Sequence, residues 1–330
     1  MVEARNTKPV EPGPAEAASS QPVVSVVIVS WNAHDYLLQC LESLSAKACC
    51  YPMEIIVVDN ASSDGSADAV ERRYPHARLI RNSSNLGFAK ANNIGLRLSS
   101  GKYICLVNSD VKVLDGCITE LVDYMEKHPR TGLAGPRMLD SEGKVGRSCR
   151  GFPTVWNLFC VALGVDVLLP KLRLFGGYTL RYWPHNTTRL VDILGGWFWI
   201  VRRQALGAVG PLDENFFFYA EDMDWCKRFH QEGLDVVYVS SAASIHYGGG
   251  SSRNAPIKYA IQQLRANLQY LKKHHSRVAQ AACFCICIVH QATRLIGHGL
   301  LLLFRPRSDE STYKVQRSWY SLLWLIKGGA

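Results

Sequence analysis

The first 113 residues alternate four times between a short apolar run and a segment with helical periodicity. The apolar runs are rich in Val and Ile, which is typical of strands buried on both faces of a sheet. They cover residues 23–30, 54–58, 77–80 and 103–107. This alternation predicts parallel βαβ units with right-handed crossovers, and therefore an α/β fold built on a doubly wound, mostly parallel sheet.

Polar side chains gather directly after each predicted strand. They are Asn32 after the first strand, Asp59 and Asn60 after the second, residues 82–85 after the third and residues 108–110 after the fourth. Because the carboxyl ends of parallel strands share one edge of a sheet, all four clusters are expected to line the edge where open α/β sheets bind ligands.

Asp110 ends the fourth cluster and is the first candidate for a metal ligand. A hard divalent cation takes oxygen ligands, and Mg2+ usually takes one or two protein carboxylates together with phosphate oxygens. An aspartate at this point can equally open a turn through its side chain. On these residues alone, both interpretations of Asp110 stay open.

Two common nucleotide-binding classes are disfavoured by the sequence. No GxGxxG follows the first predicted strand, which argues against a dinucleotide-binding dehydrogenase. No GxxxxGK[ST] occurs in the chain, which argues against a P-loop NTPase. Asp59 is placed to accept hydrogen bonds from a base or a ribose. Its alternative role is to close a turn or cap a helix, and for Asp64 we favour that alternative.

The middle of the chain is less regular than its first third. We predict a helix over 118–128, strands over 133–138 and 236–239, and an irregular insertion over 140–190 with one apolar helix near 155–169. A further strand over 191–203 contains the pair Gly195-Gly196, and such a pair permits the close approach of a ligand or another backbone.

An acidic group follows three consecutive phenylalanines. Glu221, Asp222 and Asp224 stand behind residues 216–218, and aromatic surroundings should desolvate a carboxylate, raise its pKa and suit it to accept a proton. On a helix, Glu221 and Asp224 would share a face while Asp222 would point elsewhere. The alternative is ordinary acid enrichment in a first helical turn, which the helix dipole favours.

A series of motifs in one order resembles family 2 glycosyltransferases with the GT-A fold, and in particular their rhamnosyltransferase-like branch. The resemblance covers about residues 23–252. The motifs are VVIVSWN at 26–32, IVVDNASSDGS at 56–66, NLGFAKANN at 85–93, LVNSD at 106–110, GG at 195–196, VRR at 201–203, VGPLDE at 209–214, FFYAEDMD at 217–224 and HYGGGS at 246–251. Each motif alone is weakly specific, whereas their shared order is strong.

The resemblance implies roles for individual positions. Asp59 is similar to the acid that binds the pyrimidine base of the donor, and Asp110 is similar to the last acid of the metal-binding DxD motif. Asn108 replaces the first acid of that motif, which leaves one carboxylate where the family pattern has two. His246 is similar to the histidine that completes the metal site.

The acceptor side follows from the same resemblance. Asp222 matches the second acid of the family's ED pair, the expected catalytic base, and Glu221 matches the first. Gly195, Gly196 and Trp197 fall where the family lines its acceptor site. The remaining predicted contacts are Asp224 for the acceptor, and Asn32, Asn85, Lys90 and Asn108 for the donor.

These implied roles predict a metal-dependent inverting glycosyltransferase. It would use Mg2+ or Mn2+ and a UDP-, dTDP- or GDP-sugar, with dTDP-rhamnose as a candidate, and a lipid-linked or polysaccharide acceptor in cell-surface glycan synthesis. One alternative is a catalytically silent sugar-nucleotide-binding or scaffold protein at the membrane, suggested by the missing first acid. A nucleotidyltransferase is a third interpretation, but its Gly-rich phosphate loop is absent near the first strand.

The positive charge of the chain is concentrated at its C-terminal end. Residues 1–257 carry 26 Lys/Arg and 26 Asp/Glu, so the net charge of +9 lies within 258–330. A helix is expected over 259–271, followed by a largely apolar segment over 278–304 with flanking Lys and Arg. An apolar helix with flanking Lys and Arg favours a position in the membrane interface. The longest apolar run of the segment has nine residues, which is shorter than the roughly 20 that a membrane-spanning helix needs.

The tail has other interpretations that the sequence leaves open. It can pack on the catalytic part or on a second copy of the chain in a homodimer. Nucleic acid is a weaker partner, because the basic residues alternate with Leu and Cys. The 11 cysteines form no CxxC pair and no signal peptide is evident, which predicts a cytoplasmic protein with reduced thiols, peripheral at the inner face of the cell membrane.

We therefore predict three parts. Residues 1–22 are rich in Pro, Glu, Ala and Ser and are expected to form a disordered arm. Residues 23–257 would form the catalytic domain, with a nucleotide-binding half over 23–113 and an acceptor half over 114–257. Residues 258–330 would form the basic amphipathic helical tail.

Overall fold

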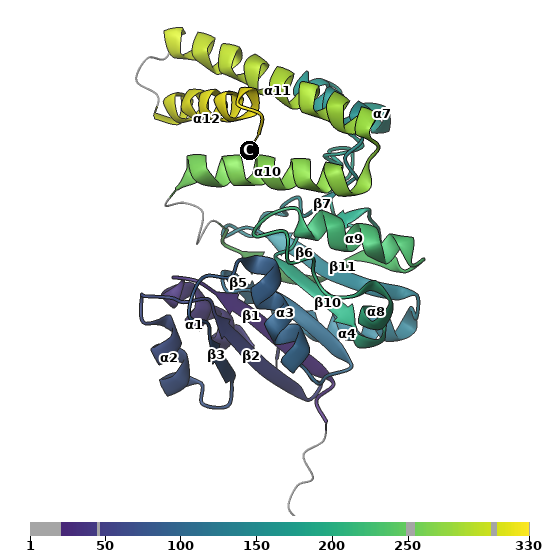
Figure 1. Cartoon of the computed structure of the whole chain (residues 1–330). Coiled ribbons are helices and arrows are strands. Elements are labelled where there is room, and N and C mark those ends of the chain that lie inside the picture. The colour runs from purple at the N-terminus through teal and green to yellow at the C-terminus, as the bar shows by residue number, and fades with distance from the viewer. Residues whose placement is uncertain (1–20, 45–46, 249–254, 305–308, 330) are drawn as a thin grey trace, which may run out of the picture.

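A central sheet with helices on both faces carries a stack of three further helices (Figure 1). The computed structural model describes residues 21–44, 47–248, 255–304 and 309–329, with no side chains described at 303–304. The predicted arm lies outside these ranges except for its last two residues, as do Arg305, Arg307 and most of the Gly-rich segment after His246. The three-part division of the chain stays a prediction.

The predicted parallel half of the sheet is confirmed. It consists of β1 (Val24–Ser30), β2 (Met53–Asp59), β3 (Arg78–Arg81) and β4 (Tyr103–Asn108), in the order β3-β2-β1-β4. The intervening helices are α1 (His34–Ser43), α2 (Ser66–Arg73) and α3 (Phe88–Leu98). Ser30 pairs with Asp59 and Val29 with Asn108, so the strands end at a common edge and the polar residues after them gather there.

The second half of the sheet is mixed. It adds β5 (Val111–Val113), β6 (Thr131–Leu139), β8 (Arg189–Leu190), β10 (Phe198–Arg202) and β11 (Asp235–His246). The order continues β4-β10-β6-β11-β5, with β10 antiparallel to both neighbours and β8 paired to β11. The strand predicted over 236–239 was too short, because a register shift after Val239 lets β11 continue to His246.

The insertion contains three short helices where the sequence predicted one. They are α5 (Val155–Ala162), α6 (Val165–Leu168) and α7 (Arg173–Gly176). Gly164, with φ at 71°, separates the first two and ends the predicted helix. Inside the insertion, β7 (Cys149–Arg150) pairs with β9 (Ile193–Leu194), and this two-stranded ribbon places Arg150 opposite Ile193, just before the Gly195-Gly196 pair.

Two apolar clusters pack on opposite faces of the sheet. Strand β1 shows why, since Val27 belongs to one cluster while Val26 and Ile28 belong to the other. The first cluster takes side chains from α3, α8 (Arg203–Val209) and α9 (Glu221–Gln231), and the second from α1, α2 and α4 (Cys117–Lys127). These opposed layers hold the strand ends in fixed positions.

The C-terminal stack consists of α10 (Pro256–His274), α11 (Arg277–Phe304) and α12 (Asp309–Ile326). Helix α10 lies between the sheet and the other two helices (Figure 1), and its Ala266, Tyr270 and Leu271 belong to the first apolar cluster. Packing of the tail on the catalytic part, left open by the sequence, is therefore observed for α10.

Helix α11 is long and apolar. Its segment Arg277–Leu302 has 26 residues and a mean hydropathy of 1.3, so by length and composition alone it could cross a membrane. Val278, Ile296 and Leu300 are more than half exposed. The helix also packs against α5, α10 and α12, which leaves one side available to another surface.

Candidate active site

A cavity of about 430 Å3 lies at the sheet edge where the predicted polar clusters meet. It brings together most of the site residues predicted from the sequence. Those that line it are Asn85, Asn108, Asp110, Gly195, Gly196, Trp197, Glu221, Asp222 and His246. They come from segments far apart in the chain, so a single concave site joins the predicted donor, acceptor and metal residues.

Asp110 and His246 face each other inside the cavity. Asp110 follows β4 and His246 ends β11, which pairs with β5 so that His246 stands opposite Val111. The His246 Nε2 atom lies 3.3 Å from Asp110 Oδ1, and both side chains are largely buried. A carboxylate oxygen and an imidazole nitrogen at this separation form a pair that can bind one divalent cation.

Trp197 packs against this pair. Its ring stacks on the His246 ring with centroids 5.5 Å apart and an interplanar angle of 20°. The Trp197 carbonyl also accepts a hydrogen bond of 3.0 Å from the Asn108 backbone N–H. The contact orients the imidazole and joins the residue predicted for the acceptor to those predicted for the metal and donor.

A strained loop presents the two acids of the cavity. Tyr219 and Ala220 have φ values of 72° and 67°, a conformation that is costly for residues with a Cβ. Helix α9 begins directly after them, so Glu221 and Asp222 occupy its first turn. Gly196 lies against Asp222, since a Cβ on Gly196 would be 3.6 Å from the Asp222 Cβ.

Burial perturbs both acids. Desolvation, reinforced by the neighbouring Asp222 charge, raises the pKa of Glu221 well above its usual range. Glu221 Oε2 has no hydrogen-bond partner among the described residues. Desolvation also raises the pKa of Asp222, while the positive charge of Arg150 and nearby backbone N–H groups oppose that rise. Carboxyl groups with perturbed pKa values often lie in catalytic sites, because proton transfer needs a matched pKa.

The donor side of the cavity is organised by an amide network. Asn60 Nδ2 donates to Asn85 Oδ1 at 2.9 Å, and Asn60 Oδ1 accepts from Leu86 N at 3.0 Å. Asp59 lies just behind Asn60, is 4% exposed, and its Oδ1 has no hydrogen-bond partner among the described residues. A buried acceptor of this kind is usually satisfied by a hydrogen-bond donor, which can be water or a bound molecule.

Besides Asp59, which lies behind Asn60, two predicted donor contacts do not line the cavity. Asn32 is exposed, and its Oδ1 accepts a hydrogen bond of 2.8 Å from Ser63 N, so it holds the loop after β2. Lys90 is exposed on α3. Neither placement brings the side chain into the cavity, and the predicted direct contact of these two residues with a donor does not fit their positions.

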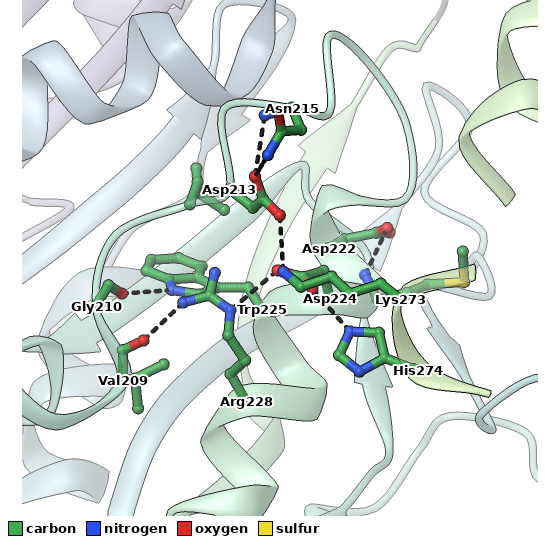
Figure 2. A network of polar contacts seen from close by, with 12 residues as sticks. Val209, Gly210, Asp213, Asn215, Asp222, Asp224, Trp225, Arg228, Lys273 and His274 are labelled. Carbon is green, nitrogen blue, oxygen red and sulfur yellow. Dashed lines mark hydrogen bonds and ion pairs between the residues drawn. The ribbon is translucent and has the colours of Figure 1, made fainter. Parts of the chain in front are cut away.

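Asp224 occupies a different environment from the other acids (Figure 2). It is fully buried and accepts from Arg228 Nε at 2.9 Å, Lys273 Nζ at 2.6 Å and His274 Nε2 at 2.8 Å. Arg228 also donates to the Val209 carbonyl. The carboxylate is thus used to fasten α10 to α9, and the predicted contact of Asp224 with an acceptor does not fit this placement.

Several cavity residues escaped the sequence prediction. Asn60, Arg147, Arg150 and Gln263 line the cavity. Asn60 stood in a recognised polar cluster, whereas the other three were not among the predicted site residues. Nothing in their local sequence indicates that the β7–β9 ribbon would turn Arg150 toward Asp222, because that pairing is non-local.

Known proteins resemble this chain in sequence and in fold. A family model described as Glycosyl transferase family 2 matches residues 25–207. The chain is 30% identical over 268 residues to an N-acetylglucosaminyl-diphospho-decaprenol L-rhamnosyltransferase of Mycobacterium tuberculosis, covering 77% of this chain and 85% of that relative. It is 26% identical to rhamnosyltransferase WbbL of Escherichia coli K12, over 76% of this chain and 93% of that relative.

Solved structures with the same fold include two metal-containing transferases. A mannosyltransferase from Pyrobaculum calidifontis, in complex with GDP-Man and Mn2+, aligns with a TM-score of 0.55 at 16% identity, over 98% of this chain and 90% of that chain. GalNAc-T7 with UDP, GalNAc and Mn2+ aligns with a TM-score of 0.53 at 14% identity, over 93% and 56%. At these identities the likeness concerns the fold.

Proposed function

Because the chain belongs to glycosyltransferase family 2, we propose that it moves a sugar from a nucleotide-diphosphate donor to a hydroxyl of a lipid-linked saccharide in cell-surface glycan synthesis. Rhamnose is the proposed sugar, because two relatives that match along most of their length are named rhamnosyltransferases. The observation that carries the proposal is the single cavity shared by Asp110, His246 and Asp222.

The residues around Asp110 fit a divalent cation, Mg2+ or Mn2+. Among the described residues no group of three or more His, Cys, Asp or Glu side chains could hold an ion, so Asp110 and His246 would act with oxygens of the donor diphosphate. A cation bound there would neutralise the charge that develops on the leaving diphosphate. Trp197, stacked on His246, keeps the imidazole oriented for that role.

Asp222 is the proposed general base. It lines the cavity with Gly195, Gly196 and Trp197, where the acceptor hydroxyl would approach the donor from the side opposite the diphosphate. Its raised pKa lets the carboxylate take the hydroxyl proton during attack. A single displacement of this kind inverts the anomeric centre. Glu221, buried behind Asp222, is proposed to increase the proton affinity of the pair.

The donor base is proposed to bind at Asp59. Its unpartnered, buried Oδ1 atom at the end of β2 supports a hydrogen bond from a pyrimidine N–H. Asn60 and Asn85 then hold the adjacent loop in place through their amide network. Asn108 is proposed to contact the donor from the end of β4.

Membrane contact is proposed for the tail, at the cytoplasmic face. Exposed apolar side chains on α11, together with the net charge of +9 carried by the last part of the chain, suit a surface with anionic headgroups. Such an attachment would keep the cavity close to lipid-linked saccharides.

A donor screen tests the proposed function. The full chain is mixed with UDP-, dTDP- and GDP-sugars, each with Mn2+, with Mg2+ or with EDTA, and thermal stabilisation and slow donor hydrolysis are measured. We expect one nucleotide class to stabilise the protein and to be hydrolysed only with metal present, with dTDP-rhamnose the preferred donor. An absence of metal-dependent stabilisation and hydrolysis across all donors would overturn the assignment.

A further inference from the structure

A second cavity of about 360 Å3 lies between the insertion and the C-terminal helices. Its walls come from β7, α5, α10, α11 and α12, so it exists only because the tail folds over the insertion. Helix α11 is fastened there by Thr293, whose Oγ1 donates to the Ala162 carbonyl at 3.3 Å. None of the residues that the sequence marked for catalysis lines this second cavity.

The two cavities are neighbours that share part of their walls. Arg150, Gln263 and Asn267 line both of them. Arg150 is also the positive charge that acts on Asp222. Arg150 therefore stands between the proposed general base and the second cavity, where an acceptor whose hydroxyl meets Asp222 would place its next group.

The charge of the second cavity is one-sided. Arg150 and Arg317 line it, and none of its described lining residues is acidic. In the described part of the chain, neither arginine forms a salt bridge with a carboxylate. The polar lining also includes the amides of Gln263, Asn267 and Gln291, the hydroxyls of Tyr178, Thr179 and Ser321, and the imidazole of His290. Arginine forks together with amide donors form a set that suits phosphate oxygens.

Apolar side chains share the walls of the second cavity with the arginines. They are Leu158, Val161 and Ile286. On the same two helices, Phe159 of α5 is 43% exposed and Val289 of α11 is 45% exposed. The neighbouring cavities thus offer a carboxylate, cations and apolar surface, which match the hydroxyl, the diphosphate and the hydrocarbon of a lipid-linked saccharide.

We infer that the second cavity binds the diphosphate of a polyprenyl-diphosphate-linked acceptor through Arg150 and Arg317. The inference rests on the proposed function and deepens it, because it names the part of the acceptor that the tail recognises. The C-terminal helices are then a wall of the substrate site as well as a contact with the membrane.

Binding of a simple diphosphate lipid tests the site without any sugar transfer. The probe is farnesyl diphosphate in neutral detergent, titrated into the full chain in EDTA so that metal-mediated binding at Asp110 is removed. Farnesol is the comparison probe, since it shares the hydrocarbon and lacks the charge. The variant is Arg317→Gln, and the matched control is Lys314→Gln, one turn earlier on α12, where Lys314 pairs with Glu310.

We expect Arg317→Gln to weaken farnesyl diphosphate binding about tenfold, the size typical of a lost charge-assisted hydrogen bond. Lys314→Gln should leave that dissociation constant unchanged, and farnesol should not distinguish the two variants. Equal weakening by both variants would identify a general charge effect and overturn the inference, as would unchanged binding in Arg317→Gln.

Transfer measurements separate this inference from the proposed function. Two acceptors with the same terminal sugar are compared, one on a lipid diphosphate and one on a neutral alkyl glycoside. Arg317→Gln should lower the preference in kcat/KM for the diphosphate acceptor about tenfold. The native chain can fail to transfer sugar to either acceptor and still bind farnesyl diphosphate in a way that depends on Arg317. That result would contradict the proposed function and support the diphosphate site.

Discussion

Asp222 and Asp224 lie two positions apart on α9, and their carboxylates have opposite surroundings. Asp222 lines the cavity, where it is half-buried beside Gly196. Asp224 is fully buried and bonded to Arg228, Lys273 and His274 (Figure 2). Two residues of one acidic motif thus have different roles. Asp222 is accessible from the cavity, whereas Asp224 connects α9 to α10.

Asp222→Asn should abolish most of the transfer and leave donor binding intact. The amide keeps the shape of the side chain but cannot accept the proton of the acceptor hydroxyl. General-base help is worth about 10²–10⁴-fold, so kcat should fall within that range while the donor dissociation constant stays constant. Steady-state kinetics and a donor titration give both numbers. Near-normal turnover of Asp222→Asn would contradict this assignment and make Glu221 the candidate general base.

Asp224→Ala should destabilise the protein rather than act on chemistry. Removing this buried carboxylate leaves the Arg228 and Lys273 charges without their shared partner, and breaking a buried ion pair in this way costs about 3–5 kcal/mol. Urea unfolding measures the loss. Asp213→Ala is the control, because Asp213 bonds only Lys273 among the cations of this cluster and is more exposed, so its cost should be smaller.

Asp110→Asn should uncouple donor binding from the metal. The neutral amide is a poorer cation ligand, so Mn2+ should no longer increase stabilisation by the nucleotide sugar, and turnover should be lost. Asp115→Asn, an exposed aspartate close by in the sequence, is the matched control. Thermal shifts measured with and without EDTA give the comparison. Retained metal dependence in Asp110→Asn would place the cation elsewhere.

Glu221 should make stability fall as the pH rises. Its folded-state pKa is raised by burial, so the folded protein holds a proton that the unfolded chain releases above about pH 4.3. The free energy of unfolding should therefore decrease from that pH up to the folded-state pKa. Glu221→Gln cannot ionise and should be more stable than the native chain at neutral pH, with the advantage disappearing near pH 4.

Urea unfolding across this pH range tests the Glu221 prediction. The exposed Glu120 provides the control, since Glu120→Gln should follow the native pH dependence. An unchanged pH dependence in Glu221→Gln would show that the buried carboxyl is not the group responsible.

Charges placed on α11 should weaken membrane contact. Ile296→Glu combined with Leu300→Glu adds two acids to exposed apolar positions, and binding to vesicles containing anionic lipid at low salt should fall severalfold. Leu190→Glu places one acid at an equally exposed apolar site on β8 and should leave vesicle binding unchanged. Vesicle co-sedimentation measures all three proteins. If the native chain does not bind such vesicles, the membrane proposal is contradicted.

The gathering of Asp110 and Asn108 at one edge of the sheet could be predicted because they stand at the end of a strand. Asp110 follows a buried apolar run, and the shared edge of parallel strands follows from the alternation of elements. The position of His246 could not be derived in this way. It reaches Asp110 only because β11 continues past its register shift and pairs with β5.

The sequence by itself determined the parallel half of the sheet, the polar edge and the family, because burial periodicity and short motifs are local properties of a chain. Only the tertiary structure decided that β10 runs antiparallel between β4 and β6, that Asp224 is tied to α10, and that Arg317 joins Arg150 in a second cavity. Those features depend on contacts between distant segments, and no local pattern of side chains specifies which distant surface a given face will meet.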